Sequence, residues 1–272
     1  MKKVLVFLVL AVMLVSVGAC SYVPSTRFMS GSQVNALVKE YGNPQAEVTL
    51  SYTIDSKEHE IKMTYELLLS QTPLAVIRFI QLANDGFYDD TVIDTYHSSA
   101  PLYMILGRYT YKESKVNDGK MTFYVNNGLD VTFKGEFASN NYGEPKDGYA
   151  VAEAFSLAMY YDNPGSESSE NFDKANGTLM LTLDNVLNSN NHAVFAHMIS
   201  VSYDGGTARN KMPNSAMENL KSFTSRTSER KIYTDETEET TIPSFSMMNK
   251  IVTVHVKILG DHDWSKLPQI KK

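Results

Sequence analysis

The sequence predicts a mainly β fold, a closed β-barrel with helices covering its ends, and a β-sandwich is the alternative. Three observations favour this fold. Alternating apolar and polar residues recur along the chain, 16 Tyr and 12 Phe accompany many Thr and Val, and two helical patterns stand out, one early and one late. A sheet with one apolar face must bury it, and a closed barrel with covered ends does so.

The first twenty residues have the pattern of a secretory signal that ends at a cysteine. Lys2 and Lys3 precede an apolar run over residues 4–17, and Val-Gly-Ala stands directly before Cys20. The run is too short and wrongly flanked for a spanning helix. The ending resembles a bacterial lipobox, in which the cysteine is lipidated and becomes the mature N-terminus. We expect a signal peptide over residues 1–19 and a lipid-anchored, extracytoplasmic protein of a bacterial cell membrane. The alternative is an ordinary signal peptide that happens to end near a cysteine.

Charge and cysteine content limit the functions open to the chain. The formal net charge is -6, and removal of Lys2 and Lys3 with the signal peptide changes it to -8. An acidic body argues against nucleic acid and against electrostatic docking on anionic lipid. Cys20 is the single cysteine, so an intrachain disulfide is impossible. The Asp-His-Asp sequence at 261–263 has no second cluster spaced for ligation, and we expect neither a metal nor a cofactor.

Two alternating runs early in the chain predict a β-hairpin. Apolar side chains recur at every second position over residues 48–54 and again over residues 61–69, and the polar sequence Asp-Ser-Lys at 55–57 separates them. Before the hairpin, residues 20–45 form the lipidated N-terminus. Their Pro and Gly content predicts a flexible tether with room for one short helix over residues 33–41.

A helix follows the hairpin over residues 72–85. Thr72 can cap it, Pro73 suits its first position and Gly86 is a natural stop. Ile77 and Ile80 belong to its apolar stripe and should be buried. A second helix is predicted over residues 214–223, and further strands are predicted over residues 102–105, 121–125, 129–133, 179–183, 193–199 and 251–259.

Five segments resemble cyclophilins, in the order in which that family has them. Residues 61–91 read IKMTYELLLSQTPLAVIRFIQLANDGFYDDT, which resembles the strand, the helix and the Gly-Phe-Tyr turn that open a cyclophilin. The other segments are Tyr103-Met104-Ile105, Lys134-Gly135-Glu136-Phe137, Asn176-Gly177-Thr178-Leu179-Met180-Leu181 and His192-Ala193-Val194-Phe195. The resemblance covers residues 46–260 and implies an eight-stranded barrel with two capping helices, followed by a tail over residues 261–272. A competing alignment register stays open between residues 155 and 195.

The resemblance implies a peptidyl-prolyl cis-trans isomerase. Such a site holds proline in an apolar pocket and donates hydrogen bonds that favour the twisted peptide. The family's arginine, its main donor, falls on Thr95, and the family's glutamine falls on Leu106. A gap in the alignment would let His97 or Arg108 approach the position of Thr95. The predicted substrate-binding residues are Tyr103, Met104, Leu106, Leu179, Leu181 and His192.

These replacements leave two functions open. The first is a lipid-anchored isomerase with weakened catalysis that assists the folding of secreted or envelope proteins. The second is a non-catalytic module that binds proline-containing segments or another envelope protein. A solute-binding lipoprotein is disfavoured because the two-lobed α/β pattern is missing. The sequence also offers no nucleophile with an adjacent base, since its one cysteine is assigned to the lipid.

Overall fold

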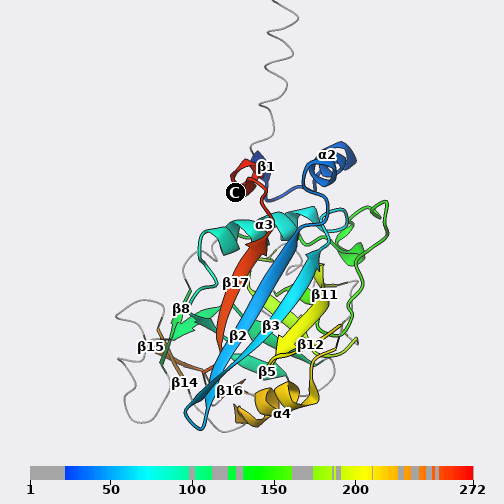
Figure 1. Cartoon of the computed structure of the whole chain (residues 1–272). Helices are drawn as coiled ribbons and strands as arrows, with labels where there is room; N and C mark the ends of the chain where they lie inside the picture. The colour runs from blue at the N-terminus through cyan, green and yellow to red at the C-terminus, as the bar shows by residue number, and fades with distance from the viewer. Residues whose placement is uncertain are drawn as a thin grey trace, which may run out of the picture.

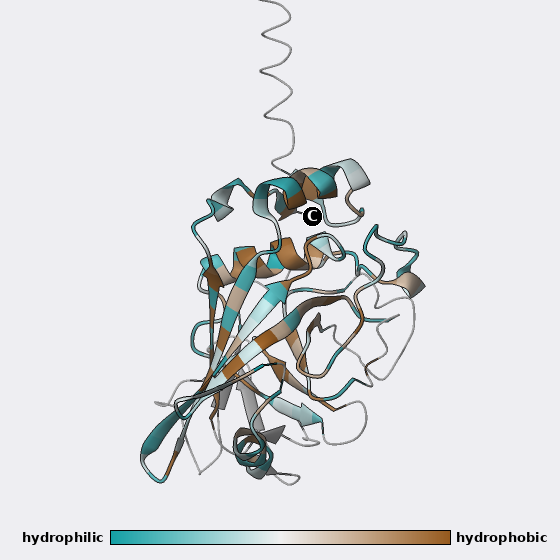
Figure 2. Ribbon diagram, turned by 45° about the vertical axis from the view of Figure 1, so that its right-hand side comes forward, coloured by the Kyte–Doolittle hydropathy of each residue, from teal (hydrophilic) through white to brown (hydrophobic). Residues whose placement is uncertain are grey.

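The computed structural model describes residues 22–97, 102–111, 122–126, 131–160, 174–185, 187, 191–209, 211–225, 230–233, 239–242, 247–248 and 251–271. A strongly curved sheet forms the body, with helix α3 (Pro73–Asn84) across one end and helix α4 (Asn214–Ser222) at the other (Figure 1). Helix α2 (Gly31–Tyr41) lies beyond α3. Hydrophobic residues gather on α3 and in the body, whereas the tip of the longest hairpin is hydrophilic (Figure 2). The predicted signal peptide and Cys20 lie outside the described residues.

The strands of the body close a ring. They are β2 (Gln45–Ile54), β3 (Lys57–Leu67), β4 (Thr91–Val92), β5 (Thr95–His97), β6 (Tyr103–Leu106), β9 (Leu157–Met159), β10 (Leu179–Thr182), β11 (Val194–Tyr203) and β17 (Thr253–Leu259). Antiparallel pairing runs β5-β6-β10-β9-β11-β3-β2-β17-β4. Between β4 and β5, the Ile93 amide donates to Val252 and the Asp94 amide donates to Ile105. The ladder of paired strands therefore returns to the segment where it starts. The predicted closed barrel is confirmed, and the alternative of a β-sandwich is not.

Short strands extend the ring on its outside. The strands β7 (Tyr109–Tyr111), β8 (Thr122–Val125), β14 (Arg230–Tyr233) and β15 (Glu239–Ile242) continue from β4, β16 (Met247–Met248) and β13 (Thr224–Ser225) continue from β5, and β12 (Gly206–Ala208) pairs with β11. Five predicted strands correspond to β6, β8, β10, β11 and β17. The strand predicted over residues 129–133 is not formed in its described part, where Phe133 makes one isolated bridge with Ala175.

The predicted hairpin is confirmed as β2 and β3. Leu50, Ile61 and Met63 are fully buried, and the polar residues that alternate with them on β3 face solvent. Asp55 and Ser56 have positive φ values of 49° and 64°, which is the two-residue turn geometry that matches the twist of paired strands. Apolar residues at every second position thus fix which face of this hairpin enters the core.

Helix α3 is the predicted helix over residues 72–85, and Ile77 and Ile80 are fully buried as expected. The N-terminal cap differs from the prediction. The Thr72 hydroxyl does not cap the helix but donates to the backbone oxygens of Leu68 and Val194. Its hydroxyl therefore ties the start of the helix to β11 and leaves the first helical N–H groups to another partner.

That partner is Glu136, from the predicted Gly-Glu-Phe segment that precedes a short 3-10 helix (Ala138–Asn140). Its two carboxylate oxygens accept the backbone N–H groups of Leu74 and Ala75, each at 3.0 Å. The side chain is buried, and burial raises the pKa of the carboxyl to about 8, although both N–H groups act in the opposite direction. A residue some sixty positions away thus satisfies the first turn of α3.

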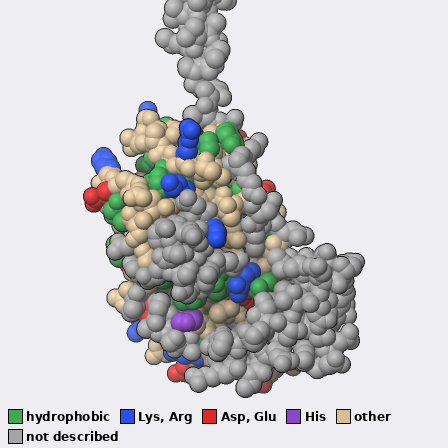
Figure 3. Space-filling view, turned by 180° about the vertical axis from the view of Figure 1, so that it is seen from behind, with side chains coloured by type: hydrophobic (Ala, Val, Ile, Leu, Met, Phe, Trp, Pro, Cys, Tyr) green, Lys and Arg blue, Asp and Glu red, His purple; other side chains and the backbone are tan. Residues whose placement is uncertain are grey.

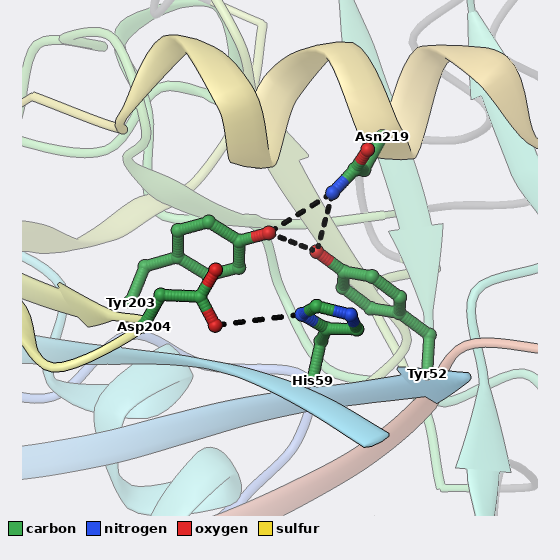
Figure 4. A network of polar contacts seen from close by, with 5 residues as sticks. All are labelled: Tyr52, His59, Tyr203, Asp204 and Asn219. Atoms are coloured by element: carbon green, nitrogen blue, oxygen red, sulfur yellow. Dashed lines mark hydrogen bonds and ion pairs between the residues drawn. The ribbon is translucent and has the colours of Figure 1, made fainter. Parts of the chain in front are cut away.

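A polar network attaches α4 to the far end of the barrel (Figure 4). The Asn219 side-chain amide donates to the hydroxyl of Tyr203 at 2.9 Å and to that of Tyr52 at 3.5 Å, and the two hydroxyls are 3.3 Å apart. The His59 ring stacks on Tyr52, and its Nδ1 lies 3.4 Å from Asp204 Oδ1. The helix is therefore held at the ends of β2, β3 and β11 by hydrogen bonds as well as by its buried Ala216 and Leu220.

Both ends of the described chain form a layer over α3, which we call the terminal layer and which differs from the flexible tether and separate tail that we expected. Strand β1 (Tyr22–Pro24) pairs in parallel with β18 (Gln269–Lys271), and its Val23 is buried. Tyr41, the last residue of α2, stacks on Trp264 of the 3-10 helix Trp264–Lys266. The Gln81 side chain of α3 donates to Pro268. The sequence expectation failed because the apolar partners of residues 22–41 lie at the opposite end of the chain.

Candidate functional site

The strands that carry the predicted site have two different faces. Opposite residues on β5 and β6 are Thr95 with Ile105, Tyr96 with Met104 and His97 with Tyr103. Side chains alternate along a strand, so residues with odd numbers here share one face and residues with even numbers share the other. Tyr96 and Met104 pack in the main core inside the barrel, whereas Tyr103 and Ile105 belong to a separate cluster on the outer wall.

This alternation divides the predicted substrate-binding residues. The side chains of four of them are fully buried within the main core, and they are Met104, Leu106, Leu179 and Leu181. These four are core residues of the barrel and cannot line an outer pocket together with Tyr103. The sequence resemblance matched these residues by type alone. Since a displacement of one residue along a strand moves a side chain to the opposite face, such a match does not determine the face.

On the outer wall, a second apolar cluster includes Tyr103. We call it the outer cluster, and its buried members are Tyr103, Ile105, Ala150, Ala152, Ala158, Tyr160, Met180, Leu187 and Val194. Ile105 and Met180 are directly opposite on β6 and β10. The segments around residues 150 and 187 contribute to the cluster, and β6 carries it up to its border with β5. We call this border the edge of the cluster. There Thr95 and His97 are both half-buried.

Arg108 lies at this edge. Gly107, with a φ of 82°, turns the chain after β6 and directs Arg108 back towards β5. The Arg108 Nε donates to Asp94 Oδ2 at 2.6 Å, and its Nη2 donates to Thr95 Oγ1 at 3.4 Å. Its guanidinium carbon lies over the ring of Tyr109, 4.8 Å from the centroid, and 5.6 Å from the centroid of Tyr160. The Arg108 side chain is 20% exposed and that of Asp94 is fully buried.

The electrostatics of this edge keep Arg108 charged. Burial lowers the pKa of the guanidinium, but Asp94, Tyr109 and Tyr160 together raise it by more, so the net pKa is raised. Burial also raises the pKa of the Tyr103 hydroxyl, and the positive charge of Arg108 partly opposes that rise. Tyr103 is therefore a neutral phenol close to a permanent cation.

The remaining predicted residues take different positions. Thr95 holds the place that the resemblance gives to an arginine, and Arg108 reaches that place from the next turn. His97 stacks flat on Tyr103, with ring centroids 4.7 Å apart and planes 3° apart. His192 is half-buried and lies two residues before the start of β11. The structure thus brings Thr95, His97, Tyr103 and Arg108 together on one wall of the barrel.

Chemically, this edge offers a fixed donor group beside an aromatic and apolar surface. A guanidinium presents five N–H donors in a rigid plane, and stacking together with the Asp94 contact restricts its orientation. In the described residues, no group of three or more His, Cys, Asp or Glu side chains is arranged to hold a metal ion. The arrangement can therefore bind a peptide carbonyl without any covalent step.

Sequence reasoning missed several members of this edge. It assigned no role to Asp94, and it did not single out Ile105, Met180 or Tyr160 as site residues. Strand alternation could have identified Ile105, because Thr95 and Ile105 must share a face once their strands pair. Nothing in the local sequence shows that Asp94 contacts Arg108, fourteen residues away.

Comparisons with known proteins give matches among solved structures alone: no protein-family model and no curated protein matches the chain. A cyclophilin type peptidyl-prolyl cis-trans isomerase from Cryptosporidium parvum has 12% identity and a TM-score of 0.41, covering 78% of this chain and 98% of its own. The same enzyme in the presence of the dipeptide Ala-Pro has 12% identity and a TM-score of 0.42, covering 78% and 99%. A cyclophilin from Hirschia baltica has 11% identity and a TM-score of 0.29, covering 84% and 99%. These structural neighbours are cyclophilin-type isomerases, the family that the sequence resembles.

Proposed function

We propose that this protein is a lipid-anchored, extracytoplasmic peptidyl-prolyl isomerase of cyclophilin type with weakened catalysis, and that Arg108 is its hydrogen-bond donor. The observation that carries the proposal is the position of Arg108. Its guanidinium contacts Thr95 at the place where the sequence resemblance requires an arginine. The order of the five resembling segments and the closed barrel support the same assignment.

Prolyl isomerisation needs little from a protein beyond such an arrangement. The barrier of ~18–20 kcal/mol comes from the partial double-bond character of the peptide C–N bond. A donor that hydrogen-bonds the peptide better in its twisted state than in either planar state lowers this barrier. Arg108 can act in this way because Asp94 and Tyr109 hold its guanidinium, so that little reorganisation is needed when the peptide twists.

Two features support weak rather than efficient turnover. Ile105 stands opposite Thr95, so the position beside the donor is apolar and cannot orient a neighbouring carbonyl. The outer cluster is buried, which limits the apolar surface available to a proline ring. The same apolar position favours the second candidate function, a non-catalytic module that binds proline-containing segments of secreted or envelope proteins.

Exchange NMR on an Ala-Pro peptide distinguishes the two functions. The wild-type protein should accelerate exchange between the cis and trans peptide, and Arg108→Met should reduce that rate about 100- to 1000-fold, the usual effect of losing one preorganised donor. The exposed Arg209 offers a matched control, and Arg209→Met should leave the rate unchanged. Peptide binding without exchange would favour the non-catalytic module. Neither binding nor exchange would refute both functions.

The proposed location rests on the N-terminal sequence. The order of basic, apolar and small residues before the single cysteine supports lipidation of Cys20. Among the helices of the described chain, none combines the length and the apolar character needed to cross a membrane. A lipid on Cys20 is thus the membrane attachment that we propose.

A further inference from the structure

The buried carboxylate beside Arg108 points to a basis for substrate selection. We propose that Asp94 is a positioning residue that aims the Arg108 guanidinium and neutralises its charge, so that the site selects prolyl segments preceded by an uncharged residue over those preceded by an acidic one. This inference rests on the proposed function and adds the substrate class. Figure 3 shows the molecule from behind the view of Figure 1, and in the coloured part of this surface basic and histidine side chains appear beside hydrophobic ones.

The geometry explains the aiming. Asp94 Oδ2 accepts from Nε at 2.6 Å, which engages the inner edge of the guanidinium. Nη2 then extends to Thr95, on the same face as Tyr103 and Ile105. Because Tyr109 covers the plane of the group, rotation about the long side chain is restricted. A free arginine on the surface would lose far more side-chain entropy when it bound a carbonyl.

The burial explains the neutralisation. Asp94 is fully buried, so water does not screen its charge and its field acts on Arg108 at close range. An arginine without such a partner attracts carboxylates, which match its planar fork in a bidentate way. A carboxylate beside an arginine lowers the net charge of the pair, and this favours a neutral peptide carbonyl over a carboxylate. The acidic net charge of the chain acts in the same direction.

Two peptides that differ in one residue test the proposal. The catalytic efficiencies of the full-length protein are measured by exchange NMR for an Ala-Pro peptide and for the same peptide with Glu-Pro. The wild-type protein should prefer Ala-Pro. Asp94→Asn should lower the efficiency for Ala-Pro about 100-fold, since small misplacements of a donor have effects of that size. It should also shift the preference towards Glu-Pro by about tenfold, because one negative charge beside the arginine is then removed.

The control variant removes an equal charge elsewhere. Asp204 lies in the turn between β11 and β12, where it contacts His59, and its φ of 47° suits asparagine as well as aspartate. Asp204→Asn should change neither the efficiency nor the preference. A shift of the preference in this control would attribute the effect to net charge and would overturn the assignment to Asp94.

Asp94→Asn alone removes this partner from a partly buried arginine, and the variant could fail to fold for that reason. A second comparison therefore does not depend on how well that single variant folds. In a chain that already carries Arg108→Met, Asp94→Asn should change neither rate nor preference further, because Asp94 acts through Arg108. A further change there, or an unaltered preference in a folded Asp94→Asn variant, would overturn the inference. If the wild-type protein processes neither peptide, the proposed function itself is wrong. The Ala-Pro rate of the wild type therefore separates the two failures.

Discussion

The capping of α3 by Glu136 leads to a quantitative prediction about stability and pH. The carboxyl group of Glu136 accepts two buried N–H groups, from Leu74 and Ala75. Its raised pKa keeps it protonated at pH 5, where its hydroxyl oxygen can still accept the second N–H. Glu136→Gln keeps the size of the side chain but offers one carbonyl oxygen, and its NH₂ group faces the second N–H. One buried donor then lacks an acceptor, which costs about 1–3 kcal/mol. At pH 5 the variant should be less stable than the wild type by this amount.

As the pH rises, the wild type should lose its advantage over the variant and then become the less stable of the two. The carboxyl has an ordinary pKa of 4.5 and a folded-state pKa of about 8. Between these values the folded state keeps a proton that the unfolded state has released, so wild-type stability falls with rising pH, by at most about 1.4 kcal/mol per pH unit. Over the whole window the loss is on the order of 5 kcal/mol. Glutamine does not titrate, and the variant lacks this contribution.

Urea unfolding at several pH values measures the difference. Far-UV circular dichroism follows the barrel, and the single tryptophan, Trp264, follows the terminal layer. Glu144→Gln is the matched control because Glu144 is exposed, and it should track the wild type throughout. A stability deficit of Glu136→Gln relative to the wild type that grows from pH 5 to pH 8.5 would show that the ionised carboxylate is the stable form, and the reasoning would fail.

Three further predictions concern the core, a turn and the anchor. Ile77→Ala should cost about 2–5 kcal/mol and Ile77→Val about 0.5–1.5 kcal/mol in urea unfolding, since Ile77 is fully buried; equal costs would argue against tight packing. Gly177→Ala should cost about 1–3 kcal/mol, because Gly177 has a φ of 110° and a Cβ there would lie 2.2 Å from Leu82 Cδ1. Gly143→Ala, where a Cβ meets nothing within 4 Å, should be close to neutral. Cys20→Ala should release the protein from the membrane fraction or leave the precursor uncleaved, and mass spectrometry that finds another mature N-terminus would contradict lipidation.

Much of the barrel could be predicted because long strands carry a clear period. Strands β2 and β3 alternate over ten residues or more, and α3 has both a broad apolar stripe and a start signal. Strands β4, β5 and β9 have two or three residues each, too few for a period to be detected. The terminal layer was missed for a different reason: the pairing of β1 with β18 joins segments almost 250 residues apart, which no local pattern reveals.

For the candidate site, the sequence named residues on two strands that pair, but not which of their side chains share a face. Thr95 and Tyr103 lie on these paired strands, β5 and β6. Met104 and Leu106 were predicted to bind substrate but lie in the main core. The resemblance compares residue types, whereas the face on which a side chain lies depends on the register of its strand. The sequence left open that Arg108 approaches the position of Thr95. This approach depends on the turn at Gly107.

The terminal layer also determines how far the body could move from a membrane. A flexible tether over residues 20–45 would have a contour length of roughly 85 Å, enough for the barrel to search a wide volume. In the structure β1 begins at Tyr22, so a lipid on Cys20 would be joined to the folded body through one intervening residue, a reach of about 7 Å. The α3 end of the barrel would then rest near the bilayer, with α4 and the hydrophilic hairpin tip directed away from it (Figure 1). The anchor would keep the folded body close to the membrane, and client chains would have to reach the protein at the membrane surface.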